Sequence, residues 1–172
     1  MGPLWEATRD LHHKAEGHPV AKRMVDGTIT AQEWADWLHA HWLIHQAIDP
    51  HLPAHVRRTD ALARDLLELL PIQPRWSLVA DGFALNLRGD PVAIFGAAYL
   101  LIGAHRRGGQ VIERAMRQHG VNLPANHIVF EDPPAAELFV RYLREQVELA
   151  DGARRAFEVL YDVMGEIHAR GY

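Results

Sequence analysis

The chain has no cysteine among its 172 residues, which excludes disulfides, thiolate metal ligands and a cysteine nucleophile. It also lacks an apolar run near the roughly 18 residues that a membrane-spanning helix needs. Its N-terminus shows no basic segment followed by an apolar one, so no secretory signal is expected. The net charge is −4, without the positive excess typical of proteins that bind nucleic acid. We therefore expect a cytoplasmic protein that binds neither nucleic acid nor a membrane.

Strict alternation of polar and apolar side chains is almost absent, whereas apolar side chains recur at helical spacing along most of the chain. Hydrophobic residues make up 48% and charged residues 23%, as in an ordinary folded protein. The length suits one domain over residues 1–172. The sequence thus predicts an all-α, single-domain helical bundle of seven or eight helices. The expected helices cover about 4–15, 20–25, 31–48, 60–70, 75–87, 91–119, 135–150 and 153–168.

Several helix ends carry local signals. Thr30 and Glu33 have the spacing of a capping box, in which each side chain binds the other residue's backbone amide. Asp90-Pro91 is typical of an N-cap followed by proline at the first helical position. Thr59 or Asp60 is expected to cap the helix that follows, and Asp151-Gly152 is expected to separate the last two helices.

Twelve histidines are the unusual feature of the composition and invite a metal or heme interpretation. His41 and His45 are four residues apart, as are His51 and His55, so each pair shares one face of a helix. The first pair could bind a metal. Without a nearby third ligand, however, such spacing is more often coincidental in a histidine-rich chain. His51 and His55 lie in a proline-interrupted segment and are expected to be exposed.

His12 and Glu16 lie on one side of the first expected helix, where His12 could bind iron or zinc or be a buried structural residue. Gly108 and Gly109 are adjacent inside the long helix expected at 91–119. Two such glycines cost roughly 1–2 kcal/mol relative to alanine. They indicate a close helix contact, a helix break, or a flat molecule lying directly against the backbone.

Four stretches of the chain resemble the heme oxygenase family. Residues 4–19, LWEATRDLHHKAEGHP, match the EAT-x-x-x-H-x-x-AE helix that opens the family, and DGTIT at 26–30 matches the capping segment after it. GGQVI at 108–112 resembles the family's distal helix, and AFEVLYDVMGEI at 156–167 its last helix. The resemblance implies a heme oxygenase-like fold and an enzyme that converts heme to biliverdin, carbon monoxide and ferrous iron. Heme b would be both substrate and cofactor.

The resemblance also implies the further reactants and the residues that contact the two faces of heme. The reaction would use O2 and electrons from an external reductant, either a ferredoxin or an NADPH-dependent reductase. His12 matches the proximal iron ligand, and Glu16 would orient or tune it. Gly108 and Gly109 match the glycines that let the distal helix approach the porphyrin.

Cationic and phenolic side chains would surround the heme propionates. Arg9 matches a basic position that neutralises a propionate in the family, and Tyr99 matches a tyrosine near the propionates. Either Arg141 or Arg144 would supply a basic contact from the first of the two closing helices. The sequence does not fix which of these two arginines has that role.

The distal stretch departs from the family pattern. Ala104 stands where a glycine is usual and would add a methyl group against heme, and His105 stands where an aspartate or a small polar residue is common. His105 could be a second axial iron ligand, could hydrogen-bond water and deliver protons, or could face solvent while Gly103 approaches heme instead. Arg106 and Arg107 could be solvated, or could form a basic patch for an acidic electron donor.

Three functions follow. The leading one is a heme oxygenase, with heme and a redox partner protein as its partners and with a monomeric or weakly dimeric state. A second is a non-catalytic heme-binding or sensor protein in which His105 is the second axial ligand. A third is a non-heme di-iron protein of the same fold, which would need carboxylates and histidines converging from three helices. For such a centre the two relevant expected helices offer His105 and Glu113, and His41 and His45.

Overall fold

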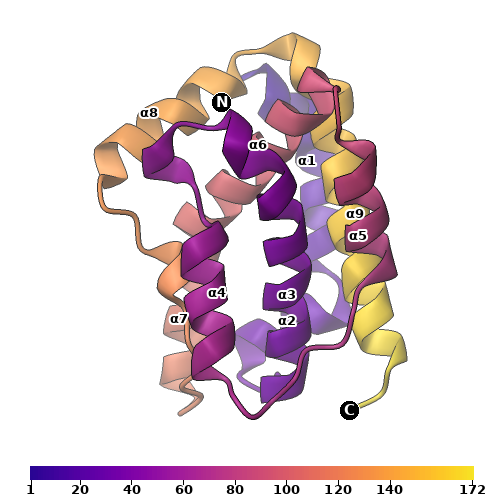
Figure 1. Ribbon diagram of the computed structural model, residues 1–172, viewed down its shortest axis with the longest axis vertical. Helices are drawn as coiled ribbons and strands as arrows, with labels where there is room; N and C mark the ends of the chain where they lie inside the picture. Colours follow the sequence, from indigo (N-terminus) through magenta and orange to yellow (C-terminus); the bar gives the residue numbers. More distant parts are fainter.

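The computed structural model describes residues 1–172 and contains helices and loops but no strand (Figure 1). Its α-helices are α1 (Pro3–Glu16), α2 (Pro19–Asp26), α3 (Ala31–Ile48), α4 (Thr59–Glu68), α5 (Leu78–Asn86), α6 (Pro91–Gly103), α7 (Gly109–Gln118), α8 (Pro133–Arg144) and α9 (Ala150–Ala169). The short helices are η1 (Asp49–His51), η2 (Ala54–Val56), η3 (Ala104–Gly108), η4 (Asn126–Ile128) and η5 (Val147–Leu149). Because η3 joins α6 to α7 without a break, these three form one continuous helix. The all-α prediction is confirmed, with eight helices counted in this way.

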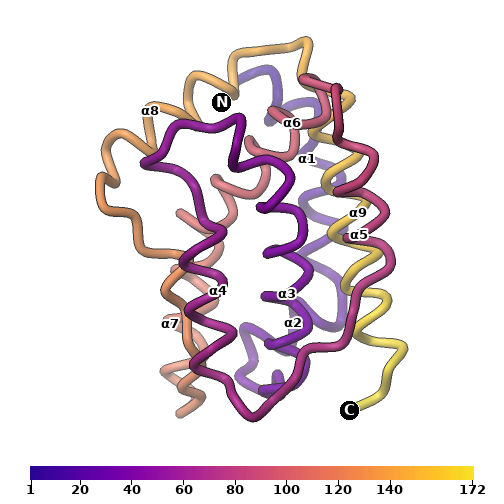
Figure 2. Tube along the Cα trace, viewed as in Figure 1, coloured from indigo at the N-terminus to yellow at the C-terminus, as the bar shows by residue number.

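Helix α9 is the central element of the packing, because α1, α5 and α6 all lie against it. Helix α3 packs between α4 on one side and α5 and α9 on the other (Figure 1). The trace in Figure 2 starts beside the end of α8 and finishes at the opposite end of the long axis. A single cluster of 39 buried hydrophobic residues connects these helices. No helix is both long enough and apolar enough to cross a membrane.

The contact between α6 and α9 depends on two glycines. A Cβ on Gly152 would overlap the carbonyl of Val92, and a Cβ on Gly96 would overlap the backbone of Ala153. The two backbones therefore touch directly. The expectation that Asp151-Gly152 separates the last two helices is wrong, since α8 ends at Arg144 and both residues lie in the first turn of α9.

The local signals at the starts of α3 and α6 are confirmed. Thr30 Oγ1 accepts the amide hydrogen of Glu33 at 3.1 Å, and the amide of Thr30 donates to Glu33 Oε2 at 2.9 Å. The carboxylate of Glu33 also accepts a hydrogen bond from Arg23 of α2 at 2.9 Å. The side chain of Asp90 accepts the amide hydrogen of Ala93 at 3.0 Å. The capping box therefore also connects two helices.

The start of α4 differs from the prediction, because neither Thr59 nor Asp60 caps it. The buried Asp49 does so from outside the helix. Its Oδ2 accepts the amide hydrogens of Arg58 at 2.8 Å and Thr59 at 2.7 Å, and also the hydroxyl hydrogen of Thr59. A carboxylate at a helix N-terminus is favoured by the unpaired amides there. This brings a negative charge into the core beside α3.

Candidate heme and metal sites

The helix that carries the two adjacent glycines is continuous but contains a π-helical turn, η3. Such turns are rare in proteins, and those that occur are often found at functional sites. Gly108 and Gly109 have φ values of −62° and −57°, so neither is required by the backbone conformation. A Cβ on Gly109 would lie 2.5 Å from Cγ2 of Ile128, whereas a Cβ on Gly108 would meet nothing within 4 Å. Gly109 thus permits close packing with η4, and Gly108 leaves another face of η3 open.

His12 lies on α1 with 37% of its side chain exposed. Its Nδ1 is buried without a hydrogen-bond partner and lies 3.6 Å from Oε1 of Glu16. The ring is held by edge contacts to Trp5 and Phe157, with centroid distances of 5.3 and 6.0 Å. Packing thus positions the ring of His12 and leaves the imidazole free of firm hydrogen bonds, so it could bind a ligand that arrives from solvent.

Tyr99 on α6 is buried, with 8% exposure. Burial raises the pKa of its hydroxyl, while the nearby Arg144 and Thr8 act in the opposite direction. Arg144 is partly buried at the end of α8, whereas Arg141 is exposed. Arg9 is largely exposed, with its guanidinium 3.7 Å from Glu6. The structure thus brings Arg144 toward Tyr99 and leaves Arg9 and Arg141 on the surface.

His105 is directed into the protein, with 3% exposure. Its Nε2 lies 2.9 Å from Nε2 of His45, and the two nitrogens share one hydrogen. The alternative in which His105 faces solvent and Gly103 takes its place is therefore wrong. Arg106 is largely buried and lies 2.5 Å from Glu137, so it is not a solvated side chain. Arg107 remains 67% exposed.

Three histidines from two other parts of the chain lie around His105. Its ring centroid lies 5.1 Å from those of His41 and His45 on α3 and 5.0 Å from that of His127 on η4. All four side chains are buried. We call this group the histidine cluster; it consists of His41, His45, His105 and His127. The α3 pair therefore has two further histidines beside it, although no three ligand atoms of the cluster lie within 4.8 Å of one another.

Two buried carboxylates orient two of the rings. Nδ1 of His45 lies 2.9 Å from Oδ1 of Asp49, and Nδ1 of His127 lies 2.6 Å from Oδ2 of Asp65. Asp65 also accepts the amide hydrogens of Asn126 at 2.6 Å and His127 at 3.0 Å. Burial alone would raise the pKa of each carboxyl, but these hydrogen bonds lower it overall. Both carboxylates are therefore negatively charged and act as acceptors for the Nδ1 hydrogens.

The remaining member of the cluster, His41, has no hydrogen bond at either ring nitrogen. Its ring packs against Trp37 at a centroid distance of 4.3 Å. Burial and the neighbouring histidines hold the pKa values of His41 and His105 well below 6.5, and burial also lowers that of His45. In neutral solution these imidazoles carry no charge.

The sequence did not predict three residues of this arrangement, namely Asp49, Asp65 and His127. Asp49 follows His45 by four residues, a helical spacing that indicates a possible pair. Asp65 and His127 are 62 residues apart and carry no local signal. Their contact depends on how the loop after α7 folds back over α4.

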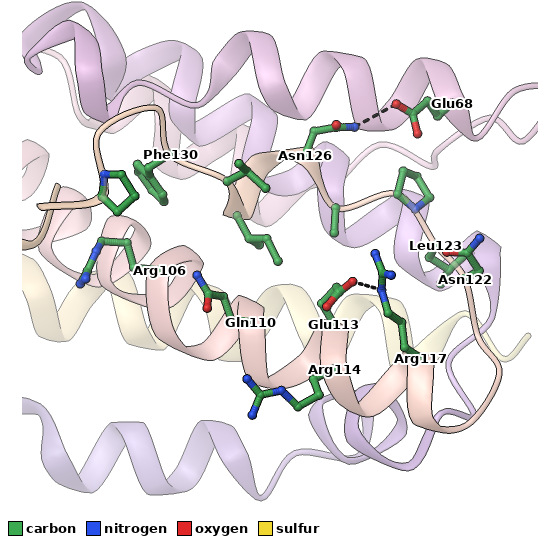
Figure 3. Close-up of a pocket in the computed structure, with 15 residues that line it drawn as sticks. Glu68, Arg106, Gln110, Glu113, Arg114, Arg117, Asn122, Leu123, Asn126 and Phe130 are labelled. Carbon is green, nitrogen blue, oxygen red and sulfur yellow. Dashed lines mark hydrogen bonds and ion pairs between the residues drawn. The ribbon is translucent and has the colours of Figure 1, made fainter.

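A separate groove of about 700 Å³ lies between α7 and the segment at 122–133 (Figure 3). Its lining is mainly polar and includes ion-paired Glu113 and Arg117, together with Asn126, which donates to Glu68 at 2.9 Å. None of the proposed heme-contacting residues His12, Tyr99 and Gly108 lines this groove. It is a different surface feature from the face of η3 that Gly108 leaves open.

The comparisons with known proteins agree with this architecture. The heme oxygenase family model matches residues 2–166, so the chain belongs to the heme oxygenase family. No curated protein was found to match the chain.

Solved structures of three bacterial heme oxygenases have a similar fold. Heme oxygenase-1 of Synechocystis, solved with heme, has a TM-score of 0.78 and 15% identity over 97% of this chain and 91% of that one. The Leptospira interrogans enzyme has a TM-score of 0.80 and 16% identity over 96% and 100%. Heme oxygenase-2 of Synechocystis, solved with heme and NO, has a TM-score of 0.81 and 18% identity over 97% and 84%.

Proposed function

We propose that this protein is a heme oxygenase that cleaves heme to biliverdin, carbon monoxide and ferrous iron. The reaction takes O2 and electrons from an external donor, such as a ferredoxin or an NADPH-dependent reductase. The observation that carries the proposal is His12, whose Nδ1 is buried and unpartnered on the helix that matches the start of the family. Similar folds bind heme in the two Synechocystis structures.

Residues on α1, α9 and η3 suit a flat, apolar dianion. Trp5 and Phe157 provide aromatic surface beside the imidazole, and Gly108 leaves η3 without a side chain on one face. Arg144 and Tyr99 provide a cation and a hydroxyl for propionate groups. A heme site needs this combination of one nitrogen ligand, apolar walls and a cationic rim.

In this proposal each residue has a separate task. Bound heme supplies the iron at which O2 reacts and is itself the molecule that is cleaved. His12 would hold the iron with a ring nitrogen, and Glu16, whose Oε1 lies 3.6 Å from Nδ1, would orient the imidazole. Gly108 would leave space for bound heme beside η3, and Ala104 would reduce that space by one methyl group. Tighter packing of heme is the expected consequence.

The alternative of a heme-binding sensor with His105 as second axial ligand has less support. Nε2 of His105 is occupied by His45 at 2.9 Å, and the ring is buried among other histidines. Iron ligation through that atom would break this hydrogen bond and leave His45 without its donor. An unpaired buried polar group costs about 1–3 kcal/mol. The geometry therefore favours turnover over bis-histidine ligation.

A hemin titration followed by absorption tests the proposal. We expect one heme per chain. Addition of ascorbate or of a ferredoxin–reductase system in air should then remove the Soret band and produce bilin absorption in the red. Stable low-spin heme without bilin formation would support the sensor instead. Failure to bind hemin at all would contradict both heme functions.

A further inference from the structure

We propose that His12, His13 and Glu16 bind one divalent transition-metal ion, such as Zn²⁺, when the protein holds no heme. One ligand atom of each side chain lies within 4.8 Å of the other two, and no other group of histidine and carboxylate side chains meets this condition. All three residues lie within five consecutive positions of α1. Because the proposed heme site needs the same imidazole of His12, the metal ion and heme would exclude each other.

The helix sets the spacing of the three side chains. Glu16 follows His12 by four residues and His13 by three, and both spacings place side chains on one side of an α-helix. Nδ1 of His12 lies 3.6 Å from Oε1 of Glu16. Two ligand atoms at 2.0–2.2 Å from a tetrahedral ion are about 3.3–3.6 Å apart. This pair therefore has nearly the required separation, and rotation of the exposed His13 brings in the third ligand.

One of the two rings is held in place by packing. His12 makes edge contacts with Trp5 and Phe157, at centroid distances of 5.3 and 6.0 Å. Its Nδ1 is buried without a hydrogen-bond partner, since 3.6 Å from Glu16 is too long for a hydrogen bond. Buried polar atoms normally have a partner. An ion between His12 and Glu16 would supply one, and no hydrogen bond fixes the tautomer against it.

The charges around this part of α1 also favour a cation. Glu16 forms no ion pair with a lysine or an arginine, because the cationic side chains on or against this part of the helix have other partners. Arg9 lies 3.7 Å from Glu6, Arg154 lies 2.9 Å from Asp10, and Nζ of Lys14 lies 4.3 Å from the ring centroid of Tyr161. The carboxylate of Glu16 therefore remains available to an ion.

The donor set indicates the class of metal. Two imidazoles and one carboxylate are a known ligand set for Zn²⁺, and three protein ligands leave a fourth position for water. Imidazole also suits Co²⁺, Ni²⁺ and Cu²⁺, whereas Mg²⁺ and Ca²⁺ prefer oxygen ligands. Since His13 and Glu16 are exposed, the ion can enter and leave without unfolding of the helix.

Competition with heme follows from the chemistry of one ring, and this consequence rests on the proposed function. A neutral imidazole has one N–H and one lone pair. When the lone pair of Nδ1 in His12 holds a metal ion, the other nitrogen carries the hydrogen and cannot bind iron. Glu16 is then also withdrawn from orienting the imidazole for heme. Free metal would therefore limit how much heme the chain binds.

The test of the metal site uses the full chain without heme, freed of metals with EDTA that is then removed. Zn²⁺ binding is measured by calorimetry, and we expect one ion per chain. His13→Ala should weaken it by more than about tenfold, a loss that changes beside a metal ligand already cause. Circular dichroism should show an unchanged helical fold, because His13 is exposed. The control His51→Ala/His55→Ala also removes histidines and should leave Zn²⁺ binding unchanged.

Hemin titrations with and without Zn²⁺ test the competition. At free Zn²⁺ ten times its dissociation constant, the apparent hemin affinity of the wild type should fall about elevenfold, and that of His13→Ala by no more than about twofold. The proposal is overturned if the wild type binds no Zn²⁺, if His13→Ala binds it equally well, or if Zn²⁺ leaves the hemin affinity of the wild type unchanged. Failure to bind hemin without Zn²⁺ would contradict the proposed heme function, whereas the calorimetry would still decide the metal site.

Discussion

Histidine side chains lie in two contrasting environments in this protein, at His12 and in the histidine cluster. His12 is one-third exposed, has no firm hydrogen bond and is held by two aromatic rings. The cluster is buried, and two of its members are fixed by carboxylates that are themselves held by backbone amides. A large planar substrate can reach the first site from solvent. The second is closed to a molecule of that size, because all four of its side chains are buried.

Histidine content alone therefore does not indicate a single site. The His12 region belongs to the part of the chain that resembles the family opening, whereas the cluster occupies the region where the distal stretch departs from the family pattern. His105 links these two regions, since it stands in place of the usual distal residue of the family and also contacts His45 in the core. Separate variants in each region can therefore test whether they act independently.

The largest effect is expected for His12→Ala. This change removes the proposed proximal nitrogen and should abolish axial ligation by the protein and heme turnover, while the helical fold remains because the side chain is partly exposed. Heme absorption and the bilin assay measure the result. Added imidazole should restore a ligand in the space left by the ring. A heme spectrum identical to that of the wild type would show that His12 is not the ligand.

The next largest effect is expected for Asp65→Ala, beside the histidine cluster. It leaves His127 Nδ1 and two backbone amides without their acceptor. Each buried donor left without its acceptor costs about 1–3 kcal/mol, and urea unfolding would detect this loss. The matched control is Asp10→Ala, which breaks an exposed pair with Arg154 and should change stability little. Equal effects would contradict a structural role for Asp65.

Substitution of each of the two adjacent glycines tests one face of η3. Gly109→Ala places a methyl 2.5 Å from Ile128 Cγ2 and should cost about 1–3 kcal/mol of stability. Gly108→Ala meets no neighbour and should stabilise the metal-free, heme-free protein by about 0.4–1 kcal/mol. Only the second should lower hemin affinity, since its methyl enters the proposed heme face. Thermal unfolding and hemin titration measure both, and a reversed order would contradict the assignment of faces.

The smallest effect concerns pH, measured in EDTA. The pKa values of His41, His45 and His105 lie below 6.5 in the folded protein, so below pH 6.5 the unfolded chain binds protons that the folded chain does not. The free energy of unfolding should be level above that pH and decrease as the pH falls below it. His41→Leu should reduce this slope by up to about 1.4 kcal/mol per pH unit. An unchanged slope would mean that His41 is protonated in the folded state.

Helices could be predicted well because their signals are local. The Thr30–Glu33 box and the Asp90-Pro91 start depend on residues within three positions of each other, and both are confirmed. The prediction that Gly152 lies between two helices was wrong for the same reason, because it depended only on local sequence. Its local sequence is typical of a helix boundary, but its small size serves close packing of α9 against α6. Sequence alone does not distinguish these two uses of glycine.

The helical architecture, the family resemblance and the candidate heme ligand could be predicted from local sequence, because periodicity, caps and the opening motif are carried by neighbouring residues. Only the tertiary structure decided the direction of His105 and its meeting with His45, 60 residues away. It also decided that Asp65 holds His127. Side chains distant in sequence meet only after the apolar faces of several helices have packed, so the partners of a buried polar group are a property of the whole fold.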